Sequence, residues 1–199
     1  MPARIKHSIV NVGYRCSNFW VVSVERSRLI VDLGWPNTRE TMLAGLARMD
    51  VPFRELRAGL ATHYHLDHAG LAQEFTLAGV PLLVVNLQHQ RNPRIAEHAK
   101  PADHFTSITL HDNCAITLDD SRAVLEAIGI VGQIVHTPGH SPDSVSLSLH
   151  GGDAFTGDLT HPMFVTEQEA DITNASWQRL RDRGATTAYP GHGPIRPMR

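Results

Sequence analysis

Residues 63–68 carry four side chains that can bind a metal ion. They read His-Tyr-His-Leu-Asp-His, which is three imidazoles and one carboxylate in six consecutive positions. In an extended segment alternate side chains leave the same face, so His63 and His65 lie together. Asp67 and His68 then fall on the following turn and point elsewhere. The spacing indicates that one short segment supplies two ligands to each of two metal ions.

Three later loops each offer one further ligand beside a glycine. They supply His140 in Thr-Pro-Gly-His-Ser, Asp158 in Thr-Gly-Asp-Leu and His192 in Pro-Gly-His-Gly. With the first motif this makes seven nitrogen or oxygen donors and no cysteine, a set that suits a pair of zinc ions, or iron or manganese. Asp158 could instead cap a helix or fill a turn. Some of the histidines could be surface residues of a His-rich chain.

The composition is ordinary apart from its histidines. The chain has 199 residues, of which 42% are hydrophobic and 19% charged, and its formal net charge is −2. This charge gives no electrostatic case for binding nucleic acid or an anionic membrane. The 13 histidines would make the chain cationic at mildly acidic pH and would release a His-bound metal there.

The cysteine count and the N-terminal residues bear on the compartment. Cys16 and Cys114 do not make a disulfide framework, and we interpret them as reduced thiols. No apolar run of a signal peptide follows the basic N-terminal residues, and no stretch approaches the roughly 18 apolar residues of a spanning helix. We therefore expect a cytoplasmic protein that acts on a small molecule, without nucleic-acid or membrane partners. The oligomeric state stays open.

The elements that position these residues alternate between strands and helices. Strands are predicted at residues 5–12, 18–25, 28–32, 56–62, 81–85, 107–118 (as a short pair), 133–136, 144–149, 154–156 and 186–189. Helices are predicted at residues 37–49, 69–78, 87–98 (interrupted by Pro93), 121–128 and 175–183. The ligand loops follow strand ends. No repeat or linker divides the chain, which we interpret as one domain, residues 1–199.

This order of motifs resembles the metallo-β-lactamase-fold hydrolase superfamily, with glyoxalase II-like and lactonase-like members. The resemblance covers nearly the whole chain, because Val31-Asp32-Leu33-Gly34 looks like the fold's early strand and turn and the ligand motifs follow in the family's order. It implies an α/β four-layer αββα sandwich. No helical C-terminal domain like that of glyoxalase II relatives is expected, so loops of the core would form the substrate pocket, with residues 86–105 and 159–170 as the longest candidates.

The resemblance also implies a role for each ligand. His63, His65 and His140 would hold the first metal, Asp67, His68 and His192 the second, and Asp158 would bridge them. A hydroxide shared by the ions would attack a carbonyl carbon, with Asp67 also orienting it as a catalytic residue. The implied activity is hydrolysis of a small ester, thioester or lactone.

Other activities stay open on the same scaffold. A mononuclear iron oxygenase similar to the persulfide dioxygenases would need only His63, His140 and Asp158, and would leave the second set of ligands without a use. A phosphodiesterase or nuclease and a binding protein that has lost turnover are further alternatives. Hydrolysis of β-lactams is less favoured, because the family's β-lactam-degrading members usually lack an aspartate at the position of Asp158.

His161 is a further candidate catalytic residue. It follows Asp158 by three positions, where related lactonases place a tyrosine near the substrate. It could donate a hydrogen bond or a proton to the substrate, or lie in a solvated loop. Met163 and Phe164 form an apolar pair that could line the substrate pocket. His136 is expected to pack beside the site without binding a metal.

Overall fold

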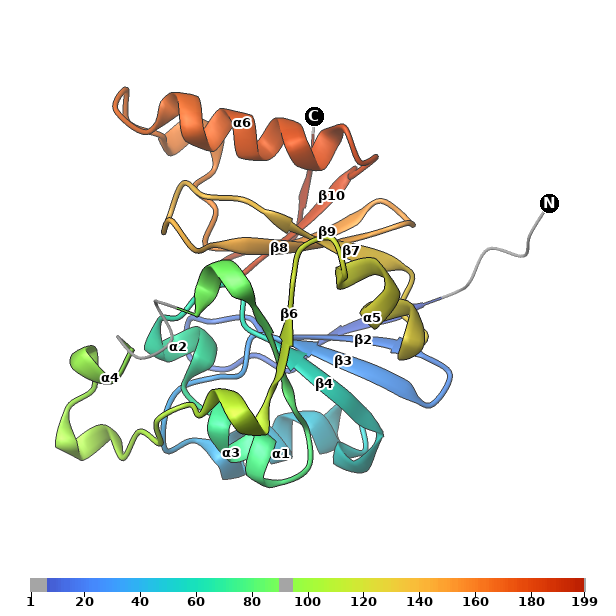
Figure 1. Ribbon diagram of the computed structural model, residues 1–199, viewed down its shortest axis with the longest axis vertical. Helices are drawn as coiled ribbons and strands as arrows, with labels where there is room; N and C mark the ends of the chain where they lie inside the picture. Colours follow the sequence, from blue (N-terminus) through green and yellow to red (C-terminus); the bar gives the residue numbers. More distant parts are fainter. Residues whose placement is uncertain (1–6, 90–94, 199) are drawn as a thin grey trace.

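Two β-sheets face each other, and helices cover the outer side of each (Figure 1). The structure is a computed structural model that describes residues 7–89 and 95–198. The first sheet runs in spatial order from β1 to β6, at Ser8–Asn11, Trp20–Val24, Ser27–Val31, Leu56–Leu60, Leu82–Val85 and Cys114–Ile116. Strands β1 to β3 pair antiparallel, and β3 to β6 pair parallel.

The second sheet has the order β11-β10-β9-β8-β7. Its strands are β7 Gly132–His136, β8 Val145–Leu149, β9 Asp153–Gly157, β10 Thr187–Pro190 and β11 Arg196–Pro197. Strands β9 and β10 are parallel, and the other pairs are antiparallel. The parallel pair matters for the site, because the loops that follow β9 and β10 leave the sheet at the same end of the strands.

Helices form the two outer layers. Helices α1 (Arg39–Arg48) and α3 (Ala72–Leu77) lie on the first sheet, and α6 (Ala170–Arg181) lies across the second (Figure 1). Helix α5 (Ser121–Ala127) lies beside β7. The one-turn helices α2 (Leu66–Ala69) and α4 (Ile95–His98) and short 3-10 turns at residues 53–55, 86–88, 101–103, 110–112 and 162–164 complete the described part. None of the described helices is long and apolar enough to cross a membrane.

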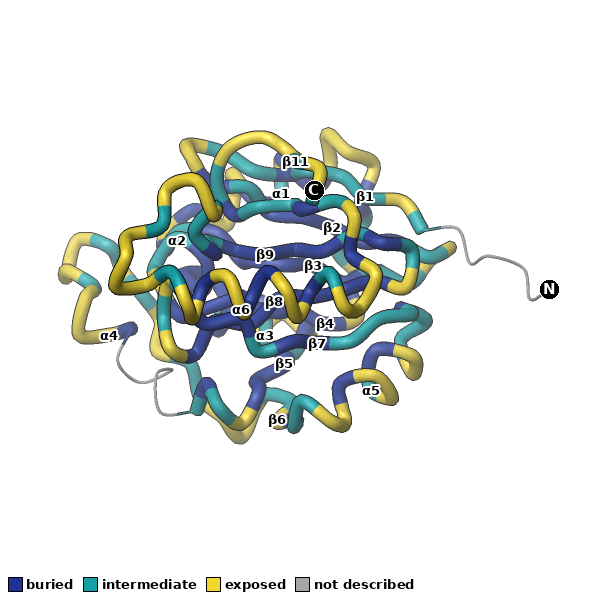
Figure 2. Tube along the Cα trace, turned by 90° about the horizontal axis from the view of Figure 1, so that it is seen from above, coloured by how far each residue is buried: buried dark blue, intermediate teal, exposed yellow. Residues whose placement is uncertain are grey.

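Strand periodicity explains the layers. In β2, Trp20 and Val22 enter the core between the sheets, whereas the intervening Val21 enters the core under α1 and α3. A third apolar cluster, with Trp177 and Leu180 of α6, joins that helix to the second sheet. The strands are buried through the middle of the molecule (Figure 2). The predicted α/β four-layer αββα sandwich is confirmed.

Three of the predicted elements are wrong in detail. The helix expected at residues 87–98 is a 3-10 turn at 86–88 and the single turn α4; residues 90–94, with Pro93, lie outside the described residues. The strand pair expected at 107–118 is the single strand β6, because the Asn113 side chain bonds to Thr76, to the Leu82 backbone and to the Thr109 carbonyl and fixes a turn before it.

The third error is the helix expected at 69–78. It divides into α2 and α3 around Gly70, whose backbone N–H donates to the Gly34 carbonyl 2.9 Å away. A Cβ on Gly70 would lie 2.4 Å from Pro36 Cδ, so only glycine permits this approach. In addition, α6 begins at Ala170, five residues earlier than predicted, and β11 was not predicted.

Candidate metal centre

All seven predicted ligands meet at one end of the two sheets. His63 and His65 follow β4, while Asp67 and His68 belong to α2. The other three come from the second sheet, with His140 between β7 and β8, Asp158 directly after β9 and His192 after β10. Their ligand atoms fall into three overlapping groups, each within 4.8 Å: His63-His65-His140, His63-His68-Asp158 and Asp67-His68-His192.

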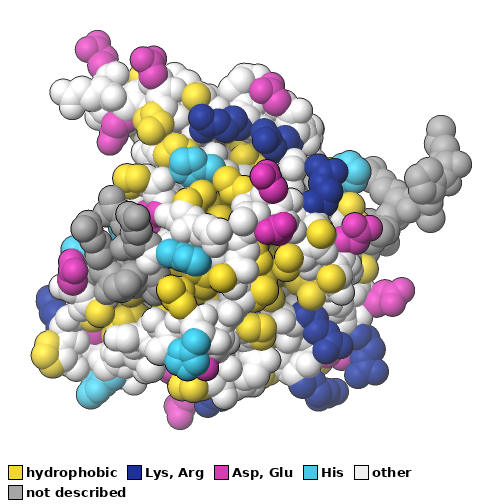
Figure 3. All heavy atoms as spheres, in the orientation of Figure 1, with side chains coloured by type: hydrophobic (Ala, Val, Ile, Leu, Met, Phe, Trp, Pro, Cys, Tyr) yellow, Lys and Arg dark blue, Asp and Glu magenta, His cyan; other side chains and the backbone are white. Residues whose placement is uncertain are grey.

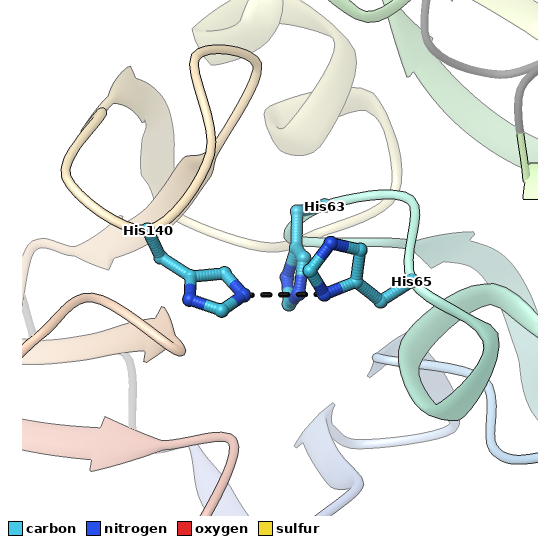
Figure 4. A group of neighbouring side chains, drawn as sticks. All are labelled: His63, His65 and His140. Carbon is cyan, nitrogen blue, oxygen red and sulfur yellow. Dashed lines mark hydrogen bonds between the residues drawn. The ribbon is translucent and has the colours of Figure 1, made fainter.

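The first group brings three imidazoles together across the sheets. His140 Nε2 lies 3.2 Å from His65 Nδ1, and the ring of His63 stands between and behind them (Figure 4). The ring centroid of His63 lies 4.4 Å from that of His65 and 4.7 Å from that of His140. Both pairs of rings pack edge to face. The three nitrogen-bearing edges therefore converge on one point.

Asp158 connects the two ends of the centre. Its Oδ2 lies 3.9 Å from His63 Nε2 and 3.6 Å from His140 Nε2, both in the first group. On the other side Oδ1 lies 3.3 Å from His68 Nε2, and Oδ2 lies 3.4 Å from His192 Nε2. One carboxylate thus faces imidazoles of both groups, as a bridging ligand must.

The remaining group is equally tight. Asp67 Oδ2 lies 3.3 Å from His68 Nε2 and 3.2 Å from His192 Nε2. Metal–ligand bonds of 2.0–2.2 Å at tetrahedral angles place neighbouring ligand atoms about 3.3–3.6 Å apart. Most of the separations measured here fall in or next to this range, so the donor set fits metal ions.

Buried atoms without a partner support the same reading. His63 Nε2, His68 Nε2 and Asp158 Oδ1 are buried and have no hydrogen-bond partner in the described part of the chain. Buried polar atoms in folded proteins are nearly always satisfied, and an unsatisfied one requires an explanation. All three atoms face the centre of the cluster, where a cation would satisfy them together.

Hydrogen bonds on the far side of three imidazoles fix which nitrogen faces the centre. His68 Nδ1 lies 2.9 Å from Asp32 Oδ2, and His192 Nδ1 donates to the Cys16 carbonyl over 2.6 Å. His63 Nδ1 lies 3.2 Å from Thr62 Oγ1, which itself donates to Asp32. A ring that donates through Nδ1–H keeps the lone pair of Nε2 for a metal.

Asp32 supports the candidate centre, although its sequence context indicated only the early strand and turn. It follows β3, is only 1% exposed, and accepts from the Thr62 backbone and hydroxyl as well as facing His68. Its φ of 64° lies in the left-handed region, which is uncommon outside glycine. An aspartate directly after a buried apolar strand was the available signal.

The loop of residues 14–18 holds the second group from outside. Ser17 Oγ donates to Asp67 Oδ2 over 3.1 Å, and the Cys16 carbonyl accepts from His192. Asn18 bonds to the Gly191 carbonyl through its backbone and to the Pro190 and Gly193 carbonyls through its side chain. One loop therefore sets the orientation of two candidate ligands from different sheets.

Gly191 lets the last loop pass close to the centre. A Cβ at this position would lie 2.5 Å from both Asp158 Oδ1 and the His68 ring. Any side chain here would force Asp158, His68 or the loop itself to move. The Pro-Gly-His pattern at residues 190–192 thus has a geometric reason in the fold.

Burial and mutual repulsion set the protonation states. Burial lowers the pKa of His63 well below its usual range, and the neighbouring imidazoles lower it further. Burial alone would raise the pKa of Asp67 and of Asp158, but His68 outweighs it and holds both below their usual values. At neutral pH both carboxylates are ionised and His63 is neutral, the states in which they bind metals.

His68 has the opposite shift. Burial would lower its pKa, but the charge of Asp32, the nearby Asp158 carboxylate and the hydrogen bond to Asp32 raise it well above the usual value. Without a metal ion, His68 therefore carries a proton on Nε2, which lies between the carboxylates of Asp67 and Asp158. Binding a metal there must release that proton.

The other predicted residues lie around this centre. His161 Nδ1 accepts from the Met163 backbone over 3.2 Å, and its ring packs against Phe164 and Trp177. Met163 and Phe164 are 78% and 69% exposed. His136 Nε2 bonds to the Pro142 carbonyl and takes no part in the three ligand groups.

The chain is similar to known proteins in sequence and in fold. A model of the metallo-beta-lactamase superfamily matches residues 13–192, from the turn before β2 to the last candidate ligand. The chain belongs to this superfamily. Among solved structures, TTHA1623 in a di-iron-bound form is 23% identical, with a TM-score of 0.70 over 96% of this chain and 94% of that one. The BLEG-1 B3 metallo-beta-lactamase is 22% identical, with a TM-score of 0.71 over 97% and 94%. These structures share the fold.

Curated relatives in this superfamily are longer proteins. A lactamase-like protein of Pestalotiopsis microspora is 29% identical over 184 residues, which are 90% of this chain and 50% of that protein. The atrochrysone carboxyl ACP thioesterase of Aspergillus chevalieri is 28% identical over 184 residues, 90% and 52%. The beta-lactamase-like protein 2 homolog of Caenorhabditis elegans is 24% identical over 188 residues, 90% and 56%. The chain thus spans about half the length of these relatives.

Proposed function

We propose that this protein is a dinuclear metal-dependent hydrolase of thioesters. The observation that carries the proposal is Asp158, whose carboxylate lies within 3.3–3.9 Å of imidazoles from both ligand groups. The proposed first metal has His63, His65 and His140, and the second has Asp67, His68 and His192. Zinc fits these nitrogen and oxygen donors, and iron or manganese would also be accepted.

The choice of thioester over ester or lactone rests on the relatives. Several similar fungal proteins bear the name atrochrysone carboxyl ACP thioesterase. Two of these relatives match 90% of this chain at 28–29% identity. The family model covers residues 13–192, which include every candidate ligand. Because the chain spans about half of their length, their acyl-carrier substrate is not transferred, and the proposal stops at the thioester bond.

The chain's own residues have distinct tasks in this reaction. Two ions held in the centre would supply a nucleophile derived from water at neutral pH and would polarise the substrate carbonyl. Asp67 keeps an oxygen facing the centre because Ser17 fixes its carboxylate, and that oxygen can orient the attacking water. Asp32, Thr62 and the Cys16 carbonyl hold the imidazole rings before substrate arrives, so little reorganisation is needed.

A matched set of substrates tests the reaction type. We expect the metal-loaded protein to hydrolyse an S-acyl thioester faster than the corresponding oxygen ester, a β-lactam or bis-(4-nitrophenyl) phosphate, and to lose this activity with a chelator. Faster cleavage of the phosphodiester would replace the proposal with a phosphodiesterase. No hydrolysis of any thioester, with both metals bound, would refute it.

Changing His161 to alanine tests the residue proposed to contact the substrate. Because Nδ1 accepts the Met163 N–H, the neutral ring carries its proton on Nε2 and can donate it. We expect unchanged metal content and a fall in kcat of about 10²-fold, the lower end for general acid–base catalysis. His161→Gln, which retains a donor, should lose less. Unchanged turnover would place His161 outside the reaction, and loss of metal would make it a ligand.

Changing Ser17 to alanine tests the outer support of Asp67. Losing this hydrogen bond should weaken binding of the second metal by about 10-fold, the lower end for residues that orient ligands. Competition with a chelator would measure it, and the first metal should be unaffected. Cys16→Ala is the matched control, because Cys16 contributes only its backbone carbonyl and its side chain is exposed. Equal effects of the two changes would contradict the assigned role.

A further inference from the structure

A hollow under α6 has a cationic wall, and residues that follow two candidate ligands in the chain line it. It has a volume of about 270 Å³ and lies between the turn at 162–164, α6, β10 and β11. Its main lining residues are His161, Trp177, Arg181, Arg196, Pro197 and Met198. Among the described residues, no aspartate or glutamate lines it. The hollow therefore suits a negatively charged group.

Two loops lead directly from candidate ligands into this hollow. His161 lies three residues after Asp158, a distance of at most about 10 Å along the chain. Arg196 lies four residues after His192, and its side chain reaches back toward that residue. A Cβ placed on Gly193, the neighbour of His192, would lie 3.4 Å from Arg196 Nη2. The guanidinium thus lies over the loop that carries a metal ligand.

Arg196 is a partly buried cation without a protein partner. Among residues 7–89 and 95–198, three arginines are partly buried, namely Arg28, Arg181 and Arg196. Arg28 pairs with Glu55 over 3.0 Å, and Arg181 also interacts with another group of the protein. Within the same residues the Arg196 side chain makes no ion pair and no hydrogen bond, although its backbone pairs with Ala188 in the sheet. A partly buried guanidinium whose donors have no protein partner can bind an anion through charge-assisted hydrogen bonds.

The other lining residues of the hollow are mainly apolar, so the anionic group would be next to an apolar part of the same ligand. The indole of Trp177 is nearly buried and its N–H is already used by the Thr160 carbonyl over 2.8 Å, so it offers an apolar face. Pro197 and Met198 extend that face. The volume lies just below the range of sites that hold a whole small molecule. The hollow therefore accommodates one end of a larger substrate.

We propose that this hollow binds a terminal oxyanion, carboxylate or phosphate, of the substrate, and that Arg196 is the residue that recognises it. The substrate class becomes an anionic thioester, with its reacting carbonyl at the metal centre and its charge at Arg196. This inference rests on the proposed thioester hydrolysis for the identity of the reacting bond. The charge recognition itself rests on Arg196 and its surroundings.

Steady-state kinetics with charged and neutral substrates test this proposal. A glutaryl thioester of a neutral thiol places the charge on the acyl part, whereas a butyryl thioester of pantetheine 4′-phosphate places it on the thiol. Each is compared with the butyryl thioester of the neutral thiol. Arg196→Gln should raise KM about 10- to 100-fold for one charged substrate, the loss of a charge-assisted hydrogen bond. For the neutral substrate KM should change less than about twofold, and kcat should be unchanged for all substrates.

Two further variants make the result specific. Arg196→Lys keeps the charge but not the fork of donors and should restore part of the preference. Arg57→Gln, on an exposed arginine of β4, should change nothing. The arm that responds identifies the acyl part or the thiol as the anionic end. An equal rise in KM for charged and neutral substrates, or no change in any, would overturn the proposal.

A binding measurement separates this proposal from the thioesterase proposal. Calorimetry on the metal-loaded protein compares pantetheine 4′-phosphate with pantetheine, and glutarate with butyrate, in the native chain and in Arg196→Gln. We expect tighter binding of one charged probe, lost in the variant. If that preference exists but no thioester is hydrolysed, the oxyanion site stands and the thioesterase proposal fails. If thioesters are hydrolysed and no preference depends on Arg196, the oxyanion site fails alone.

Discussion

Asp158→Ala should release metal from both positions and abolish most activity. The carboxylate faces His63 and His140 on one side and His68 and His192 on the other, so its removal takes a ligand from each proposed ion. A metal site with four ligands contributes about 10–16 kcal/mol in zinc peptides. Losing one ligand of four then costs about 3 kcal/mol, which weakens binding about 10²-fold at each position. Metal analysis after dialysis measures it.

The change at Asp158 has a matched control in His136→Ala. His136 lies four residues before His140. Within the part of the chain that the structure describes, its side chain bonds only to the Pro142 carbonyl, outside all three ligand groups. Its loss should leave the metal content unchanged and the rate within a few-fold. Asp158→Asn keeps the shape of the side chain and removes its charge, so it should lose metal nearly as badly as alanine. Equal damage from His136→Ala and Asp158→Ala would contradict the bridging assignment.

The residues that meet in the candidate metal centre could be predicted because their signal is local. Two histidines at alternate positions and Asp-His on the next turn have few structural uses, and the glycines beside His140, Asp158 and His192 indicate tight loops at strand ends. Their convergence could be predicted because parallel strands of a sheet end on the same side, so the loops that follow them lie close together. The family resemblance supplied the division of the ligands between two metals, which spacing alone did not give.

What the sequence did not predict depends on contacts between distant segments. The bond between Asp32 and His68 joins residues 36 apart, and the bond between Cys16 and His192 joins residues 176 apart. No local pattern encodes either pair. The same reason explains the error at 107–118, where Asn113 bonds to α3 and to β5 and replaces a strand by a turn. Arg196 was not singled out either, since its lack of a partner is visible only once the chain has folded.

Two metal ions per chain should be bound after purification, and their removal should destabilise the fold as well as stop the reaction. The expectation follows from seven donors that face one another at separations suited to metals. A ligand at a thousand times its Kd stabilises the native state by about 4 kcal/mol. For a chain of this length each kcal/mol raises Tm by about 2–4 °C, so each tightly bound ion should contribute about 8–16 °C.

Elemental analysis measures the number of bound ions, and calorimetry with and without a chelator measures the shift in Tm. His192→Ala provides the internal comparison, because it belongs to only one ligand group: it should lose close to one ion and about half of the shift in Tm. The oxygenase alternative predicts something different, since a triad of His63, His140 and Asp158 holds one iron. One iron per chain, with no second ion after loading with zinc or manganese, would leave Asp67, His68 and His192 without a metal and would refute the dinuclear centre.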